Sequence, residues 1–85
     1  MYTYIKLPEK QFRTSYIDLA TSLIVLGHEI ISCDKDKEGK FFFIFEENQQ
    51  LLSNCSNFFN KKLYLDINRF IHEKRSLKNL INYNT

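Results

Sequence analysis

The sequence predicts one α+β domain over residues 1–85, with a small, mostly antiparallel three-stranded sheet and about three helices. The expected order is βαββαα. The first indication is the run from Phe41 to Phe45, in which four Phe and one Ile follow one another. Because strand residues alternate between faces, this run is apolar on both sides and predicts a central strand. The second indication is helical periodicity in three other segments.

The first strand is expected over residues 2–7, where β-forming residues precede Pro8, and a polar bridge is expected after it. The first helix follows that bridge. Ser15 lies three residues before Asp18, which is the spacing of a capping box. Apolar residues then recur at helical spacing from Tyr16 to Leu26. Gly27 can adopt the left-handed conformation that ends many helices.

A hairpin is expected next. Residues 28–34 have β character, and the charged turn from Asp34 to Gly39 joins them to the Phe-rich strand. Glu46 and Glu47 are expected to begin the second helix, because acidic side chains favour the positive end of a helix dipole. The apolar spacing of that helix, which includes Phe58 and Phe59, ends near residues 60–62.

The segment Leu63–Leu65 permits two interpretations. As a fourth strand it would make the fold a ferredoxin-like variant, and otherwise it is an extended connector, which its short length favours. Asp66 is expected to cap a final helix. The buried positions of that helix would be Ile67, Phe70, Ile71, Leu77, Leu80 and Ile81. Lys74 and Lys78 project into this apolar face, so the helix bends or lies at an edge, or the two ammonium groups meet something negative.

The formal net charge of +2 is too small to indicate a nucleic-acid binder by itself, but the charge is unevenly distributed. Residues 1–50 carry six Lys and Arg against eight Asp and Glu, whereas residues 51–85 carry six against two. An anionic partner is therefore expected to contact the C-terminal third. The predicted contact residues for a partner or a phosphate are Lys61, Lys62, Arg69, Lys74, Arg75 and Lys78.

The sequence predicts no enzyme, no metal and no cofactor. The residues that could ligate a metal, namely His28, Cys33, Cys55 and His72, lack the close pairing of zinc sites. No P-loop, Gly-rich phosphate motif or nucleophile elbow is present. Two cysteines without a signal peptide indicate reduced thiols in a cytoplasmic protein. No apolar run reaches the length of a membrane span, so no membrane partner is expected.

An aromatic stacking platform for single-stranded nucleic acid is the alternative for the Phe-rich strand. In a ferredoxin-like fold, Tyr2 and Tyr4 would share a face with Phe41, Phe43 and Phe45. The small residue between the aromatics and the preceding Gly of an RNA-recognition signature are absent. These rings are therefore expected to form the core.

Several short stretches carry a family resemblance. They are Asp18-Leu19-Ala20 with Leu23 and Gly27, then Phe43-Ile44-Phe45-Glu46, Phe58-Phe59, and the closing pattern Asp66, Phe70, Leu77-Lys78 and Ile81. The chain resembles a family of short uncharacterised proteins of low-GC Gram-positive bacteria and their phages and mobile elements. The resemblance implies an intracellular phage or mobile-element setting and no particular chemistry.

We therefore expect a non-enzymatic accessory protein that binds a host or self protein stoichiometrically. Inhibition of host defence is the activity that the resemblance suggests. A homodimer is expected, because it would cover the second apolar face of the Phe-rich strand. The alternative is a binder of single-stranded nucleic acid or a nucleotide that uses Lys74, Arg75 and Lys78.

Overall fold

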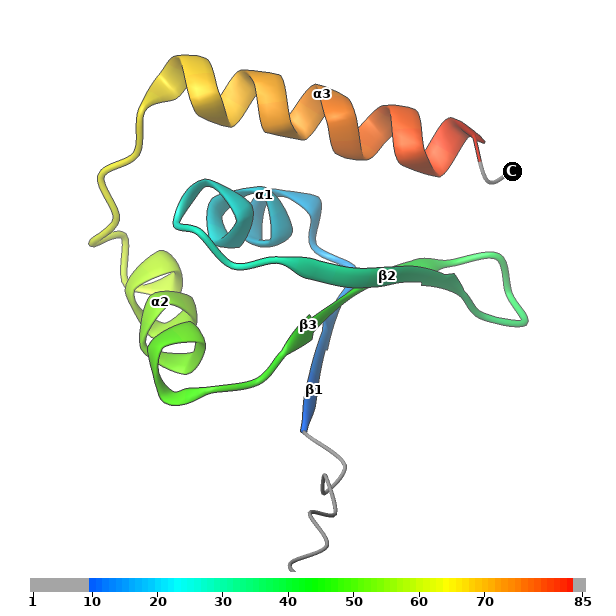
Figure 1. The fold of residues 1–85 in the computed structure, drawn as a ribbon, viewed down its shortest axis with the longest axis horizontal. Helices are drawn as coiled ribbons and strands as arrows, with labels where there is room; N and C mark the ends of the chain where they lie inside the picture. The colour runs from blue at the N-terminus through cyan, green and yellow to red at the C-terminus, as the bar shows by residue number, and fades with distance from the viewer. Residues whose placement is uncertain (1–9, 84–85) are drawn as a thin grey trace, which may run out of the picture.

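A computed structural model describes residues 10–83 of the chain. The elements follow the predicted order and confirm the α+β class (Figure 1). Their bounds are β1 (Gln11–Thr14), α1 (Ile17–Val25), β2 (Ile30–Lys35), β3 (Phe41–Glu46), α2 (Gln49–Phe59) and α3 (Ile67–Tyr83).

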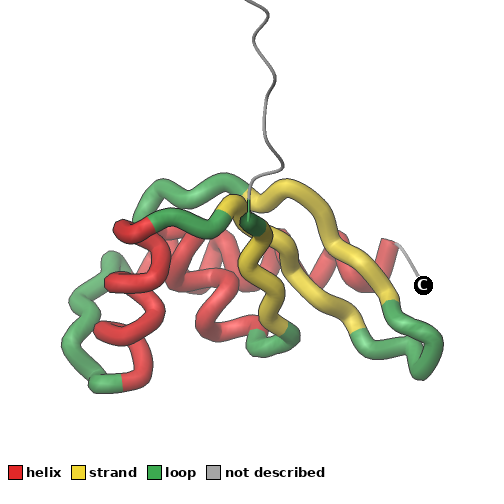
Figure 2. The backbone as a smooth tube through the Cα atoms, turned by 90° about the horizontal axis from the view of Figure 1, so that it is seen from below, coloured by secondary structure: helices red, strands yellow, loops and turns green. Residues whose placement is uncertain are grey.

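The sheet is antiparallel with strand order β1-β3-β2, so the Phe-rich strand is central, as predicted. Phe45 lies opposite Phe12 of β1, and Phe43 lies opposite Cys33 of β2. The pairing of β2 with β3 is irregular between Ile30 and Ser32, which places Ile31 at a bulge. The three strands lie together on one side of the molecule (Figure 2).

The first strand differs from the prediction. The predicted strand at residues 2–7 lies outside the described residues, and β1 occupies Gln11–Thr14, which was interpreted as a polar bridge. That interpretation is wrong, because a strand at the edge of the sheet needs only one apolar side chain to pack against the core. Phe12 packs against the core, while Gln11 and Arg13 are exposed.

The core lies where α1 is enclosed between the sheet and α3 (Figure 1). Its buried members are Leu19, Ala20, Leu23, Phe43, Phe45, Leu51, Cys55 and Leu77. Burial extends around α1 to Thr21 and Ser22. Their hydroxyls donate to the carbonyls of Ile17 and Asp18 at 2.7 and 2.8 Å, which satisfies these polar groups inside the helix.

The Phe-rich strand buries side chains on both of its faces, although Phe42 is only half-buried. Phe43 and Phe45 are 1% and 0% exposed, which confirms their predicted core role and removes them as stacking surfaces. Ile44, on the opposite face, is only 2% exposed. The burial of Ile44 therefore needs no second copy, and the homodimer stays a prediction.

Helix ends agree with the sequence prediction at two positions. Gly27 has a φ of 100° just after α1, as expected for a left-handed helix end. Asp66 Oδ1 accepts hydrogen bonds from the backbone N–H groups of Asn68 and Arg69, which confirms it as the cap of α3. Residues 63–65 form an extended connector and no strand, so the ferredoxin-like variant is not formed.

Two other predicted helix starts are wrong. The residue before α1 is Tyr16, and no side chain caps this end; its N–H donates instead to Thr14 Oγ1. Glu46 is the last residue of β3. The cap of α2 is Asn48, whose Oδ1 accepts from the Leu51 N–H at 2.8 Å.

Helix α3 is also more exposed than its apolar pattern predicts. Leu77 is buried, Leu80 and Ile81 pack against the core and Phe70 is half-buried, but Ile67 and Ile71 are 64% and 47% exposed. The reason is one of length, because nine residues of α1 span about 13 Å whereas seventeen residues of α3 span about 25 Å. Helix α1 is therefore too short to cover the whole apolar face of α3.

Candidate functional site

The outward side of α3 joins exposed isoleucines to basic side chains. At about 100° per residue, Ile67, Ile71 and Lys78 lie close together around the helix axis. They contribute to a shallow groove of ≈ 340 Å³. We call its lining the α3 stripe, which consists of Ile67, Phe70, Ile71, Lys74, Arg75 and Lys78.

The ammonium group of Lys74 has a negative partner, which is one of the outcomes predicted from its position in the apolar face of α3. Its Nζ lies 2.8 Å from Asp18 Oδ1 of α1. That oxygen is itself buried, and the ammonium group is the partner that compensates it. Lys74 Nζ also lies 6.0 Å from the centre of the Phe70 ring. Lys74 therefore helps to hold α3 on α1, whereas Arg75 and Lys78 are exposed.

The structure separates the six predicted contact residues. Lys74, Arg75 and Lys78 line one groove. Arg69 is exposed but lies roughly 180° around α3 from Lys78, and it does not line that groove.

Lys61 and Lys62 follow the end of α2, where Lys61 has a φ of 58° and the Lys62 N–H donates to the Asn57 carbonyl. Lys61 lines a second groove of ≈ 380 Å³. The other lining residues are Ser22, Phe58, Leu63, Leu65, Ile67 and Phe70, so this groove shares Ile67 and Phe70 with the α3 stripe.

An aromatic cluster at the start of α1 and the end of α2 was not predicted as a surface feature. The rings of Tyr16, Phe58 and Phe59 meet edge to face, with centroids 5.2 to 6.5 Å apart. Tyr16 and Phe59 are about half exposed or more. The sequence showed Phe58 and Phe59 at helical spacing, but it could not show that α2 leaves one of them outside the core.

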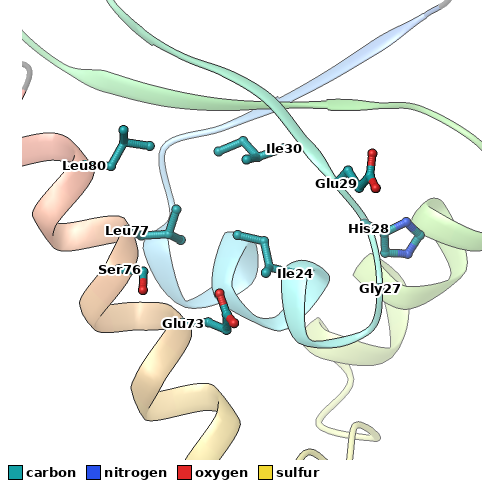
Figure 3. A pocket seen from close by; sticks show the side chains of 9 residues that line it. All are labelled: Ile24, Gly27, His28, Glu29, Ile30, Glu73, Ser76, Leu77 and Leu80. Carbon is teal, nitrogen blue, oxygen red and sulfur yellow. The ribbon is translucent and has the colours of Figure 1, made fainter.

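A larger groove of ≈ 630 Å³ opens on the other side of α3. We call it the acidic groove, and its lining is Ile24, Gly27, His28, Glu29, Ile30, Glu73, Ser76, Leu77 and Leu80. Figure 3 shows Leu77 and Leu80 of α3 facing Ile24 and Ile30 across it. Sequence reasoning did not find this site, because its residues come from two stretches, 24–30 and 73–80, that lie far apart in the chain.

One wall of the acidic groove is fixed by a hydrogen bond from α2. Asn54 Nδ2 donates to His28 Nε2 at 2.8 Å, and Gln50 Nε2 donates to Asn54 Oδ1 at 3.3 Å. Burial lowers the pKa of His28, which favours the neutral ring that this hydrogen bond requires. The loop between α1 and β2 is thereby attached to α2.

The residues considered as metal ligands lie apart. Within residues 10–83, no three His, Cys, Asp or Glu side chains are placed to hold a metal ion together. Cys33 lies on β2 and Cys55 on α2, both as free thiols. Burial raises the pKa of Cys33, with a further contribution from Asp34, and burial also raises the pKa of Cys55. Both shifts disfavour the thiolate form.

The fold and its surface define a small α+β protein with an exposed apolar and basic helix face. A family model described as a domain of unknown function (DUF5659) matches residues 9–84, so the chain belongs to that family. No curated protein and no solved structure matches the chain. Among the helices of the described residues, none is both long and apolar enough to cross a membrane.

Proposed function

We propose that this chain is a non-enzymatic binding protein that docks another protein stoichiometrically on the α3 stripe. The observation that carries the proposal is the exposure of Ile67 and Ile71 beside Arg75 and Lys78. An apolar centre with cations at its edge has the anatomy of a protein interface. The groove around it gives a partner's side chains a place to insert.

The partner's chemistry follows from the stripe. Burying two isoleucines favours apolar side chains opposite them. Arg75 and Lys78 favour carboxylates at the rim, which would increase the association rate more than the final affinity. The expected partner surface is therefore an apolar patch flanked by Asp or Glu.

The setting is part of the proposal. The resemblance to proteins of low-GC Gram-positive bacteria, their phages and mobile elements supports an accessory role in the cytoplasm of a host cell. The partner would then be a host protein or a second copy of the chain. Inhibition of host defence is the outcome that this setting suggests.

Single-stranded nucleic acid or a nucleotide is the second candidate ligand. The observation in its favour is that Lys74, Arg75 and Lys78 line one groove next to the Phe70 ring. Against it, Lys74 is already paired with Asp18, and Arg69 and Lys62 do not extend the groove into a basic track. The exposed side chains of Ile67 and Ile71 also take up part of the groove that phosphates would need to be basic.

Capture from host lysate, with and without nuclease and read by mass spectrometry, tests the proposal. The wild-type chain should retain a partner after nuclease treatment, and the Ile67→Asp/Ile71→Asp variant should lose it. Leu52→Asp is the matched control, because Leu52 is also an exposed apolar helix residue but lies on α2. It should retain the partner.

Titration with oligonucleotides at low and high salt separates the two candidates. A nucleic-acid ligand predicts binding that falls steeply with salt and with Lys78→Ala. Such binding, together with capture that nuclease abolishes, would overturn the protein-docking proposal in favour of the second candidate.

A further inference from the structure

The two sides of α3 carry complementary chemistry. Within the described residues, the acidic groove is lined by Glu29 and Glu73 and by no Lys or Arg. The α3 stripe is lined by Lys74, Arg75 and Lys78 and by no acid. Both surfaces also carry aliphatic side chains, four in the groove and two in the stripe.

The occupant that fits the acidic groove is an apolar and basic helix face. Its floor of Ile24, Ile30, Leu77 and Leu80 favours aliphatic side chains. Its rim carboxylates favour cations, and Figure 3 shows Glu73 on the α3 side of the opening and Glu29 on the β2 side. These carboxylates suit a segment that carries cations beside an aliphatic centre.

The chain itself presents such a face. In the α3 stripe, Ile67 and Ile71 form the aliphatic centre, and Arg75 and Lys78 are exposed beside them. We propose that the α3 stripe of one copy docks in the acidic groove of a second copy. This inference rests on the proposed function and names the partner that the stripe binds.

The placement of the two surfaces determines the kind of assembly. Around α3, the residues of the acidic groove and those of the α3 stripe are centred about 150° apart. One copy can therefore use both surfaces at once, and the contact joins unlike surfaces head to tail. Such a contact extends into linear assemblies or closes into a ring. Each linear assembly retains one unoccupied stripe at one end for another partner.

Two variants block the two surfaces separately. Ile71→Asp/Lys78→Glu disables the stripe, and Glu29→Lys/Ser76→Arg disables the groove. The four side chains are exposed or nearly so, and circular dichroism and thermal unfolding check that both variants fold. Lys62→Glu is the charge control, because Lys62 is exposed and lines neither surface.

Sedimentation velocity over a concentration series at low salt measures self-association. Wild type and Lys62→Glu should form a concentration-dependent series of species that high salt weakens. Each blocked variant alone should self-associate at least ~10-fold more weakly. An equimolar mixture of the two blocked variants should form a 1:1 heterodimer and nothing larger, because it still contains one intact stripe and one intact groove.

Three results would overturn the inference. Wild type could remain monomeric at every concentration, the groove variant could self-associate like wild type, or the mixture of blocked variants could stay monomeric. Retention of the lysate partner by wild type and its loss in Ile67→Asp/Ile71→Asp would leave the proposed function standing in each case. If the stripe variants keep both self-association and lysate capture, both proposals are overturned.

Discussion

At the scale of single residues, two polar side-chain contacts join the helices of the described part of the chain to one another or to a neighbouring loop. His28 and Asn54 are 26 positions apart in the chain and join the loop after α1 to α2. Asp18 and Lys74 join α1 to α3. Removal of one partner leaves the other, a buried or partly buried group, without compensation. Each contact should therefore contribute measurably to the free energy of unfolding.

The His28 contact predicts a pH dependence of stability. Because burial lowers the pKa of His28 in the folded chain, the unfolded chain binds the proton more readily. The contribution is therefore fully present above the unfolded value of 6.5, is lost as the pH falls below it, and levels off below the lowered folded pKa. Urea unfolding at pH values from 7.5 down to 5 should show this decline.

The control for this measurement is His28→Gln, which removes the titrating ring and keeps a polar side chain. Its unfolding free energy should change less with pH over the same window than that of wild type. An unchanged slope would show that other groups cause the decline.

The contact between Lys74 and Asp18 predicts a small coupling energy. The two side chains retain 31% and 39% exposure, so solvent screens much of their attraction. A double-mutant cycle with Lys74→Ala and Asp18→Asn should give a coupling of about 0.5–1 kcal/mol by urea unfolding. Lys78→Ala, one turn further along the helix, should change the unfolding free energy little.

At the scale of helices and strands, side-chain caps fix the N-terminal ends of α2 and α3, whereas the N-terminal end of α1 has no such cap. Asn48 caps α2 and Asp66 caps α3, each through a carbonyl or carboxylate oxygen. The start of α1 is held by packing between the sheet and α3. The loss of a cap should therefore matter for the two outer helices and not for the enclosed one.

Substitution of the caps tests this difference. Asn48→Ala and Asp66→Ala should each lower the unfolding free energy by about 1 kcal/mol, because the first leaves one backbone N–H group and the second two without an acceptor. Ser15→Ala should have almost no effect, although Ser15 has the spacing of a capping residue. A loss at Ser15 equal to that at Asp66 would contradict the assignment of the caps.

At the scale of the whole molecule, stability depends on a few large side chains of β3. A chain of this length has a total unfolding free energy of about 4–13 kcal/mol. Phe43→Ala or Phe45→Ala should cost about 3–5 kcal/mol, because each removes a fully buried ring from the core. Either variant should be largely unfolded or have a strongly lowered Tm.

Phe42→Ala is the matched test on the other face of the same strand. Phe42 is only half-buried, and the Arg13 guanidinium lies 4.3 Å from its ring centre. We expect a loss below about 2 kcal/mol, measured by the same urea unfolding. Equal losses at Phe42 and Phe43 would contradict the difference in burial between these two rings.

The parts of the fold that the sequence predicts correctly are those with a strong local signal. The apolar run of β3, Gly27 and Asp66 each identify an element or its end from nearby residues alone. The strand β1 has no such signal, because Phe12 is its only large apolar residue and becomes recognisable only beside Phe45.

The site is less predictable than the fold. Lys74, Arg75 and Lys78 were identified from charge and helical spacing, and they do line one groove. The exposure of Ile67 and Ile71 depends on how much of α3 the shorter α1 covers, which no local pattern encodes. The acidic groove likewise depends on how distant elements pack.

The bulge at Ile31 also affects how the sheet can meet other chains. Within the described residues β2 pairs only with β3, so its outer edge offers unpaired backbone groups to any passing strand. A regular six-residue edge would be a template for fibril growth, but the extra residue breaks the even spacing of those groups after Ile30. The irregularity thus makes the outer edge of β2 a poorer template for backbone pairing with another chain.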